Sequence, residues 1–239
     1  MIPLHTLRVI YFFSFSILTI SGCTYISSDK APLLSSPKLK NLNESERDYY
    51  ISGKIFFKHP EGSHTGEMTI QISRKSELKL SIFAPLIGSL IYEMRASSKK
   101  FLILDFQGEN YYLDENTKEV RKSLLGMDIS LTELKWLIFG NLPKKSSSWI
   151  QKKISKNEYK LTQGSTKIKI RLNTFGKIES MEKFSHGFLE YRAEISLYQK
   201  DINSNFPKKI SIKNYSEISH WLMLITERQI KSGEFNPID

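Results

Sequence analysis

The sequence predicts a mainly β domain of the α+β class, built as a curved antiparallel sheet with a helix over its apolar face. Three observations predict this class. Apolar and polar residues alternate along most of the chain, turn-forming residues separate the alternating runs, and one run has clear helical spacing. The order is strands, a helical insert and further strands, and a large curved sheet covered on one face by that helix satisfies it.

Residues 1–22 have the pattern of an export signal. Arg8 gives a positive start, and Val9 to Ile20 is almost entirely apolar. This run is too short to span a bilayer, which takes roughly 20 apolar residues, and it fits the core of a signal peptide. It ends in Ile20-Ser21-Gly22-Cys23, which resembles a bacterial lipobox, where the cysteine sulfur is acylated and the chain is cut just before it.

Cys23 is the only cysteine of the chain. An odd cysteine in an exported protein is free, paired with another chain or modified, and its position favours lipidation. The alternative is an ordinary signal peptide followed by a stray cysteine. We expect residues 23–40 to form a lipidated, flexible tether, because they are rich in Ser and Pro and show no amphipathic period.

Residues 41–239 are long enough for one sizeable core, so we expect a single domain. With no second cysteine, burial of apolar area must stabilise it. Asn43 and Glu46 have capping-box spacing and predict a short helix at its start.

The strands follow from a period-two pattern that begins near Ile51. Residues 68–73, 78–82 and 167–172 each alternate between apolar and polar side chains. One face of each strand is therefore apolar and the other is wet, as in an antiparallel sheet with one buried face. About ten such runs, separated by turn signals, predict a meander.

The clearest helix is predicted over 130–139. Ser130 and Glu133 form a capping box, and Gly140 and Pro143 end the pattern. Its apolar stripe consists of Leu131, Leu134, Leu137 and Ile138. An apolar group at Leu124, Leu125 and Met127 is consistent with a preceding helical turn.

The formal net charge is +10, from 35 basic and 25 acidic residues. A basic surface attracts nucleic acid or anionic membrane. We expect no nucleic-acid partner, because the chain has no zinc-finger spacing, RNP-type strand or arginine-rich arm. The lysines are scattered along strands and predict a solvated face, with attraction to anionic headgroups as an addition.

The sequence contains no recognisable catalytic or metal-binding pattern, so we expect no enzyme, no cofactor and no metal site. None of the five histidines has metal-ligand spacing, and no nucleophile elbow, P-loop or dinucleotide fingerprint occurs. His59 and His64 flank a turn and are expected to be polar surface. Glu93 and Glu190 lie in strand-like runs without a visible partner.

Two stretches behind the lipobox carry a resemblance to a known family. The first is Leu80 to Ser89, where a strand runs into Pro85-Leu86-Ile87-Gly88 and resumes at Leu90. The second runs from Leu125-Gly126-Met127 to Gly140-Asn141-Leu142-Pro143. In this order they resemble LolB, the outer-membrane lipoprotein receptor family, over roughly residues 41–230.

The resemblance implies an incomplete β-barrel whose helical lid covers an apolar cavity for acyl chains. It implies a lipid-anchored, monomeric receptor at the outer membrane, facing the periplasm, that needs no cofactor. Such a receptor accepts acylated lipoprotein cargo from a LolA-like periplasmic carrier and inserts it into membrane lipid. The membrane-insertion loop would be Pro85, Leu86, Ile87 and Gly88, and the lid would use Leu131, Leu134, Trp136 and Leu137.

Other interpretations remain open on the residues alone. The inward aliphatic residues are also typical of an ordinary packed core, and Leu86 and Ile87 could fold back onto the sheet. The chain could be an assembly lipoprotein that binds a protein partner through sheet edges. It could also bind another amphiphile, such as lipopolysaccharide. In the family pattern that the resemblance implies, aspartate after the cysteine is associated with inner-membrane retention, so Thr24 at that position implies the outer membrane.

Overall fold

The computed structural model describes residues 48–59, 62–73, 77–106, 110–143, 148–200, 205–214 and 219–231. All of them belong to one compact unit, residues 43–239. The export signal, Cys23, the tether and the helix predicted from Asn43 lie outside the described residues.

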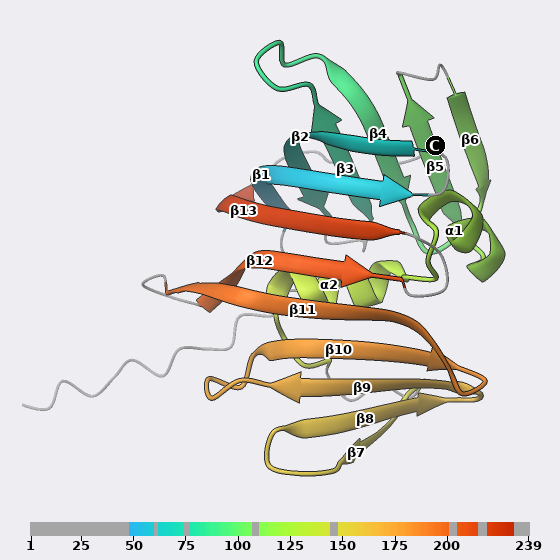
Figure 1. Cartoon of the computed structure of the whole chain (residues 1–239), viewed down its shortest axis with the longest axis vertical. Coiled ribbons are helices and arrows are strands. Elements are labelled where there is room, and N and C mark those ends of the chain that lie inside the picture. Colours follow the sequence, from blue (N-terminus) through green and yellow to red (C-terminus); the bar gives the residue numbers. More distant parts are fainter. Residues whose placement is uncertain are drawn as a thin grey trace, which may run out of the picture. The chain divides into compact units, whose positions relative to one another are not determined.

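The described residues form a single antiparallel sheet of thirteen strands, with two helices inserted between the sixth and seventh strands (Figure 1). The strands are β1 (Asp48–His59), β2 (Gly62–Ile72), β3 (Leu78–Phe83), β4 (Leu90–Ala96), β5 (Lys100–Asp105), β6 (Asn110–Glu115), β7 (Ile150–Lys153), β8 (Glu158–Gln163), β9 (Thr166–Leu172), β10 (Ile178–Ser185), β11 (Phe188–Lys200), β12 (Asn205–Lys213) and β13 (His220–Lys231). The helices are α1 (Lys118–Leu125) and α2 (Leu131–Phe139).

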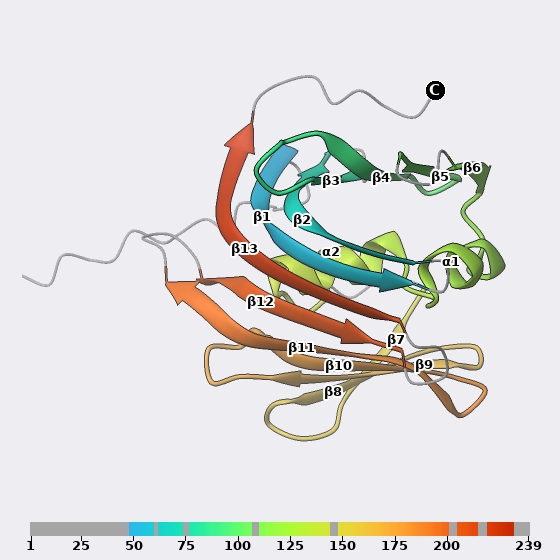
Figure 2. The same ribbon diagram turned by 45° about the horizontal axis from the view of Figure 1, so that its top comes forward.

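The sheet consists of two meanders, β1–β6 and β7–β13, which are joined by pairing of the first and last strands. Its order is β6-β5-β4-β3-β2-β1-β13-β12-β11-β10-β9-β8-β7, so β1 and β13 pair near its centre. β6 and β7 are the two edges, which leaves an open and incomplete barrel. Figure 2 shows β1 and β13 bending strongly, with α2 on the concave side of the sheet. The predicted mainly β class with a curved antiparallel sheet is therefore confirmed.

The core lies on the concave face, as the alternation predicts. Met68, Ile70 and Ile72 of β2 are almost fully buried. On β9, buried apolar residues alternate with the exposed Lys167 and Lys169. This periodicity buries apolar side chains against the helices and leaves the charged side chains in water. Burial of that apolar area is the main stabilising contribution of such a sheet.

Two glycines permit the close strand contacts in the bent part of the sheet. A Cβ atom on Gly53 would lie 2.1 Å from the carbonyl oxygen of Leu224, and one on Gly66 would lie 2.0 Å from that of Phe83. The register between β1 and β13 also shifts between Ser52 and Gly53, which marks a bulge. Bulges and glycines are the usual means by which a sheet bends.

The helical insert contains more helix than the sequence predicts. The 130–139 prediction is confirmed by α2, including its capping box and its left-handed C-cap at Gly140. α1 is a separate helix of eight residues, capped by Thr117 at its start and by Gly126 at its end. The predicted apolar turn around Leu124 and Leu125 is therefore only its last part. No helix among the described residues is long and apolar enough to cross a membrane.

Candidate functional site

The turn between β3 and β4 presents two aliphatic side chains to solvent. Its backbone is closed by hydrogen bonds from Ala84 N to Ser89 O at 2.8 Å and from Gly88 N to Ala84 O at 3.0 Å. Leu86 is 106% exposed and Ile87 is 82% exposed, so neither side chain folds back onto the sheet. Pro85 and Gly88 are exposed beside them. All four residues predicted for the insertion loop thus lie at the tip of one turn.

The backbone of Leu86 adopts a costly conformation. Its φ angle is 70°, in the left-handed region where a branched side chain is unfavourable by roughly 1–2 kcal/mol. The rest of the turn holds this conformation, since the hydrogen bond from Gly88 N spans Leu86. This backbone conformation is unfavourable, and it exposes an aliphatic side chain to water. A strained residue of this kind indicates a functional role.

The lid, meaning α1, α2 and residues 126–130 between them, covers the concave face of the sheet. α2 buries Leu134, Leu137 and Ile138 against the sheet. Leu131 and Trp136 are half-buried. The ring of Trp136 packs against the ring of Trp149, with 6.4 Å between the ring centroids. Of the four residues predicted for the lid and cavity, Leu131 and Leu134 line a cavity, whereas Leu137 is packed in the core and Trp136 packs on Trp149.

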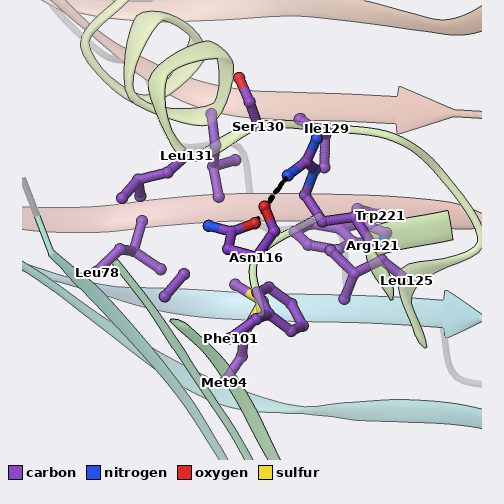
Figure 3. A pocket seen from close by; sticks show the side chains of 12 residues that line it. Leu78, Met94, Phe101, Asn116, Arg121, Leu125, Ile129, Ser130, Leu131 and Trp221 are labelled. Carbon is purple, nitrogen blue, oxygen red and sulfur yellow. Dashed lines mark hydrogen bonds between the residues drawn. The ribbon is translucent and has the colours of Figure 1, made fainter. Parts of the chain in front are cut away.

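The cavity between lid and sheet is small and mostly apolar (Figure 3). Its volume of about 10 Å³ suffices for about one water molecule. Its walls come from strands β3, β4, β5 and β13, from both helices and from the segments before them: Leu78, Met94, Ala96, Phe101, Asn116, Arg121, Leu125, Ile129, Ser130, Leu131, Leu134 and Trp221. At this cavity the lid is therefore closed onto the sheet.

A buried group of charged residues fastens the lid to the sheet. We call Arg121, Asp128, Glu133 and Lys183 the lid ion cluster. Arg121 of α1 lies 2.6 Å from the Asp128 carboxylate, and Lys183 of β10 lies 2.7 Å from the other oxygen of that carboxylate. Lys183 also lies 3.1 Å from Glu133, whose side chain caps α2 by accepting a bond from Ser130 N. Lys183 thus joins both α2 and residues 126–130, which connect α1 to α2, to the sheet.

Electrostatics within the lid ion cluster favour the charged form of Asp128. Burial alone raises the pKa of Asp128, but the charges of Lys183 and Arg121 outweigh burial and hold that pKa below its ordinary value. Nearby Tyr191 is fully buried, and burial together with the negative charge of Glu133 raises its pKa well above the ordinary value. The lowered pKa of Asp128 favours its carboxylate form, and the raised pKa of Tyr191 favours its neutral phenol.

Two ion pairs to a buried carboxylate hold α1 as well. Lys118 and Lys122 lie 3.3 Å and 2.7 Å from the carboxylate of Glu190 on β11. Glu93 is likewise paired, since Lys79 and Arg95 lie 3.1 Å and 2.6 Å from its carboxylate. Neither residue shows a partner in the sequence, but both are paired in the structure: Glu93 with Lys79 of β3 and with Arg95 of its own strand, and Glu190 with two lysines of α1.

The histidines at the β1–β2 turn also differ from expectation. His59 and His64 are 7% and 5% exposed, with their rings stacked 5.4 Å apart. The ring of Phe57 stacks on His59 at 4.8 Å, and Asp105 lies 3.5 Å from His64. The prediction of polar surface is wrong, because both residues continue the inward-facing rows of β1 and β2. Within the described ranges, no group of His, Cys, Asp or Glu could hold a metal ion.

Sequence reasoning missed Lys183, although the alternation carries a signal for it. Met181 and Ser185 on either side of it in β10 are buried, so Lys183 occupies an inward position of a regular strand. An inward lysine needs an acidic partner, since isolated buried charges are prohibitively costly. That rule predicts a buried ion pair but does not identify Asp128.

Comparisons with known proteins place this geometry in a family. The sequence matches the family of the outer membrane lipoprotein LolB over residues 47–227. It has no match among the curated proteins.

Three solved structures share the fold, each with a TM-score of 0.53. One is a domain of an outer membrane lipoprotein-sorting protein from Vibrio parahaemolyticus, 10% identical, covering 80% of this chain and 88% of that chain. Another is a LolA superfamily protein from Nitrosomonas europaea, 8% identical, covering 79% and 88%. A third is a DUF1329 family protein from Desulfovibrio piger, 8% identical, covering 80% and 89%.

At these identities the solved structures show the fold alone, and the family match carries the assignment. The LolB family and the LolA superfamily are lipoprotein transport proteins rather than enzymes. The match spans the exposed β3–β4 turn, the lid and the strands that form the cavity. The chain belongs to the family of the outer membrane lipoprotein LolB, and its role is in lipoprotein localisation.

Proposed function

We propose that this protein is an outer-membrane receptor that accepts acylated lipoproteins from a LolA-like periplasmic carrier and inserts them into the membrane. In this proposal the protein is a monomer, anchored through a lipid on Cys23, and it faces the periplasm. The observation that carries the proposal is the exposure of Leu86 and Ile87 at a rigid turn.

Two aliphatic side chains on a hydrogen-bonded turn suit shallow insertion into a bilayer. Each buried CH₂ group contributes about 0.8 kcal/mol, so Leu86 and Ile87 together give a reversible contact rather than an anchor. Reversibility matters, because a receptor held deeply in the bilayer could not release cargo repeatedly.

The lid supplies the second requirement, a shelter for acyl chains. A cavity of about 10 Å³ holds no acyl chain, so loading requires the lid to move away from the sheet. The exposed underside of the lid and the concave apolar face would then cover the chains. Closure without cargo keeps the same apolar surface out of water, and exchange down a gradient of affinity needs no nucleotide.

The test is to replace both exposed residues of the turn in Leu86→Glu/Ile87→Glu. We expect this variant to fold and to accept cargo from the carrier, but to lose insertion of cargo into outer-membrane vesicles. The matched control is Phe188→Glu, at a similarly exposed position that begins β11. Insertion at the normal rate by the double variant would contradict the proposal.

The small volume of this cavity favours a second candidate, an assembly lipoprotein that binds a protein partner through the sheet edges at β6 and β7. Native mass spectrometry of the purified protein separates the two. A bound acylated polypeptide supports the receptor, a bound glycolipid indicates a carrier of another amphiphile, and a partner bound only through its protein surface favours the assembly role.

A further inference from the structure

Three lysines lie side by side on the outer face of the sheet, one on each of β7, β8 and β9. The register pairs Lys152 with Lys160 and Lys160 with Lys169. Directly opposite residues of antiparallel strands share a face, with Cβ atoms roughly 5 Å apart. Like charges in this arrangement destabilise a sheet. The fold therefore maintains a row of positive charge that works against its own stability.

Acidic side chains do not neutralise this row. Glu182 lies opposite Lys169, but its carboxylate is held by Arg192. Within the described part of the chain, Lys152, Lys160 and Lys169 form no ion pair, and Lys169 instead lies 4.9 Å from the ring of Phe184. The three ammonium groups are available to an anionic partner.

Exposed apolar side chains border the lysine row. On edge strand β7, Ile150 is 76% exposed and shares the face of Lys152, two residues further on. Ile154, just beyond β7, is 54% exposed, and Phe175 at the β9–β10 turn is 73% exposed. A hydrogen bond from Leu172 N to Asn157 O at 2.8 Å joins the ends of β9 and the β7–β8 turn.

The turns that carry Ile154 and Phe175 project from the same side of the domain as the β3–β4 turn. In Figure 1 the β3–β4 turn lies at the upper left, and the β7–β8 and β9–β10 turns lie at the lower left. All three turns lie at that end of the strands, and the end of β11 projects further to the same side between them.

We propose that the outer face of β7–β9, with Ile150, Ile154 and Phe175 at its border, is a membrane-docking surface that binds the phosphate-bearing headgroups of anionic lipids. Lysines combine with exposed aliphatic and aromatic side chains where a protein lies in the membrane interface, because their long stems pack on the apolar boundary while the charges reach phosphate. An acidic protein partner would use the lysines but leaves the apolar tips unexplained.

The test uses the complete lipid-anchored protein reconstituted in vesicles of phosphatidylcholine alone or mixed with phosphatidylglycerol. Ile154→Cys places a thiol for the environment-sensitive fluorophore NBD, and Cys23 is the only native cysteine. We expect NBD emission to shift to the blue and to be quenched by spin-labelled lipid only when phosphatidylglycerol is present. Added salt should reverse both effects.

The decisive variant removes the lysine row in Lys152→Gln/Lys160→Gln/Lys169→Gln. Each lysine near an anionic surface strengthens membrane binding about fivefold. Loss of three lysines should therefore lower the ratio of docked to undocked protein on the order of 100-fold. The matched control Lys54→Gln/Lys99→Gln/Lys100→Gln removes the same charge from the other half of the sheet and should retain the NBD response. Equal thermal unfolding of both variants and the parent shows that folding is unchanged.

Three results would overturn the proposal: equal NBD responses in both vesicle types, loss of the response in both lysine variants alike, or a response that appears only with an acidic protein. The inference depends on the proposed function only for placing the domain beside a membrane. The measurement contains no cargo and no carrier. Normal insertion by the Leu86/Ile87 variant with an intact NBD response would therefore count against the receptor proposal alone.

Discussion

Lys183 lies 2.7 Å from the Asp128 carboxylate, across 55 residues of sequence, and this contact joins the lid to the sheet. The side chains of both residues are only 6% exposed. Asp128 lies in the connector between α1 and α2, where backbone pairing with a strand is absent. Side-chain contacts must therefore determine whether the lid is closed.

Replacing Lys183 should loosen the lid and destabilise the fold together. In Lys183→Met, Asp128 keeps Arg121 as a partner, but Glu133 loses its cation in a buried place. Removing one member of a buried ion pair costs about 3–5 kcal/mol, because the remaining charge is left uncompensated. Urea unfolding measures this loss. Lys167→Met, on the exposed face of the neighbouring strand, should change stability by less than about 0.5 kcal/mol. A similar small effect of Lys183→Met would mean that the cluster does not fasten the lid.

The cavity under α2 should become a binding site when it is enlarged. Leu134 is 4% exposed and lines the cavity, so Leu134→Ala should cost about 2–5 kcal/mol and leave an apolar void. Such voids take up small apolar molecules. We expect the variant to bind a fluorescent fatty acid more tightly than the parent does. Thr132→Ala, exposed on the same helix, is the control. Weaker or unchanged binding by Leu134→Ala would indicate that acyl chains do not enter here.

Acid should release the Asp128 contribution to stability. Because the folded-state pKa of Asp128 lies below its ordinary value, the stabilisation is fully present above the unfolded-state pKa and is lost as the pH falls through the folded-state pKa. The free energy of unfolding should therefore decline once the pH drops below about 4.

The comparison variant for that titration is Asp128→Asn. It should be less stable at neutral pH and should lose less stability between about pH 5 and about pH 2, where the parent protonates this carboxyl. Part of the acid dependence should persist, because pairing with Lys79 and Arg95 outweighs burial and also lowers the pKa of Glu93. Identical acid profiles for parent and variant would show that Asp128 does not titrate as inferred.

The sequence predicts the parts of this fold that depend on local periodicity. The alternation in β9 and the Ser130–Glu133 capping box identify a strand and a helix without reference to the rest of the chain. The β3–β4 turn is visible because Pro85 and Gly88 interrupt an apolar run. The first part of α1 is missed because the segment Lys118–Ser123 is mostly polar and shows no apolar stripe.

Properties that depend on distant partners cannot be derived in this way. Lys118 and Lys122 meet Glu190 only because α1 crosses to β11. His59 and His64 are buried because neighbouring strands and Phe57 close around them. The row from Lys152 to Lys169 also appears only when the register of three strands is known. In each case the sequence gives the residue types, but only the order and register of the strands show which of them lie close together.

The bend in β1 should be sensitive to a single methyl group. Gly53→Ala places its Cβ atom against the carbonyl oxygen of Leu224, so the strands must separate, at a cost of about 1–3 kcal/mol or more. Gly62→Ala is the matched control, since only the His59 ring comes within 4 Å, at 3.9 Å. Thermal unfolding should give a clearly lower midpoint for Gly53→Ala alone. Equal midpoints would mean that β1 and β13 adjust without strain.

A substitution at Leu86 should change stability and cargo insertion in opposite directions. Asparagine tolerates the left-handed conformation better than leucine does, so Leu86→Asn should relieve strain and raise the free energy of unfolding by about 0.5–1 kcal/mol. The same substitution removes an apolar side chain that is wholly exposed, so insertion of cargo should fall while acceptance of cargo is retained. Ile87→Asn removes a similar side chain without relieving the strain at position 86, and it should lower insertion without the gain in stability. If Leu86→Asn raised stability and left insertion intact, the strained leucine would have no part in membrane contact, and Ile87 would be the residue that enters the bilayer.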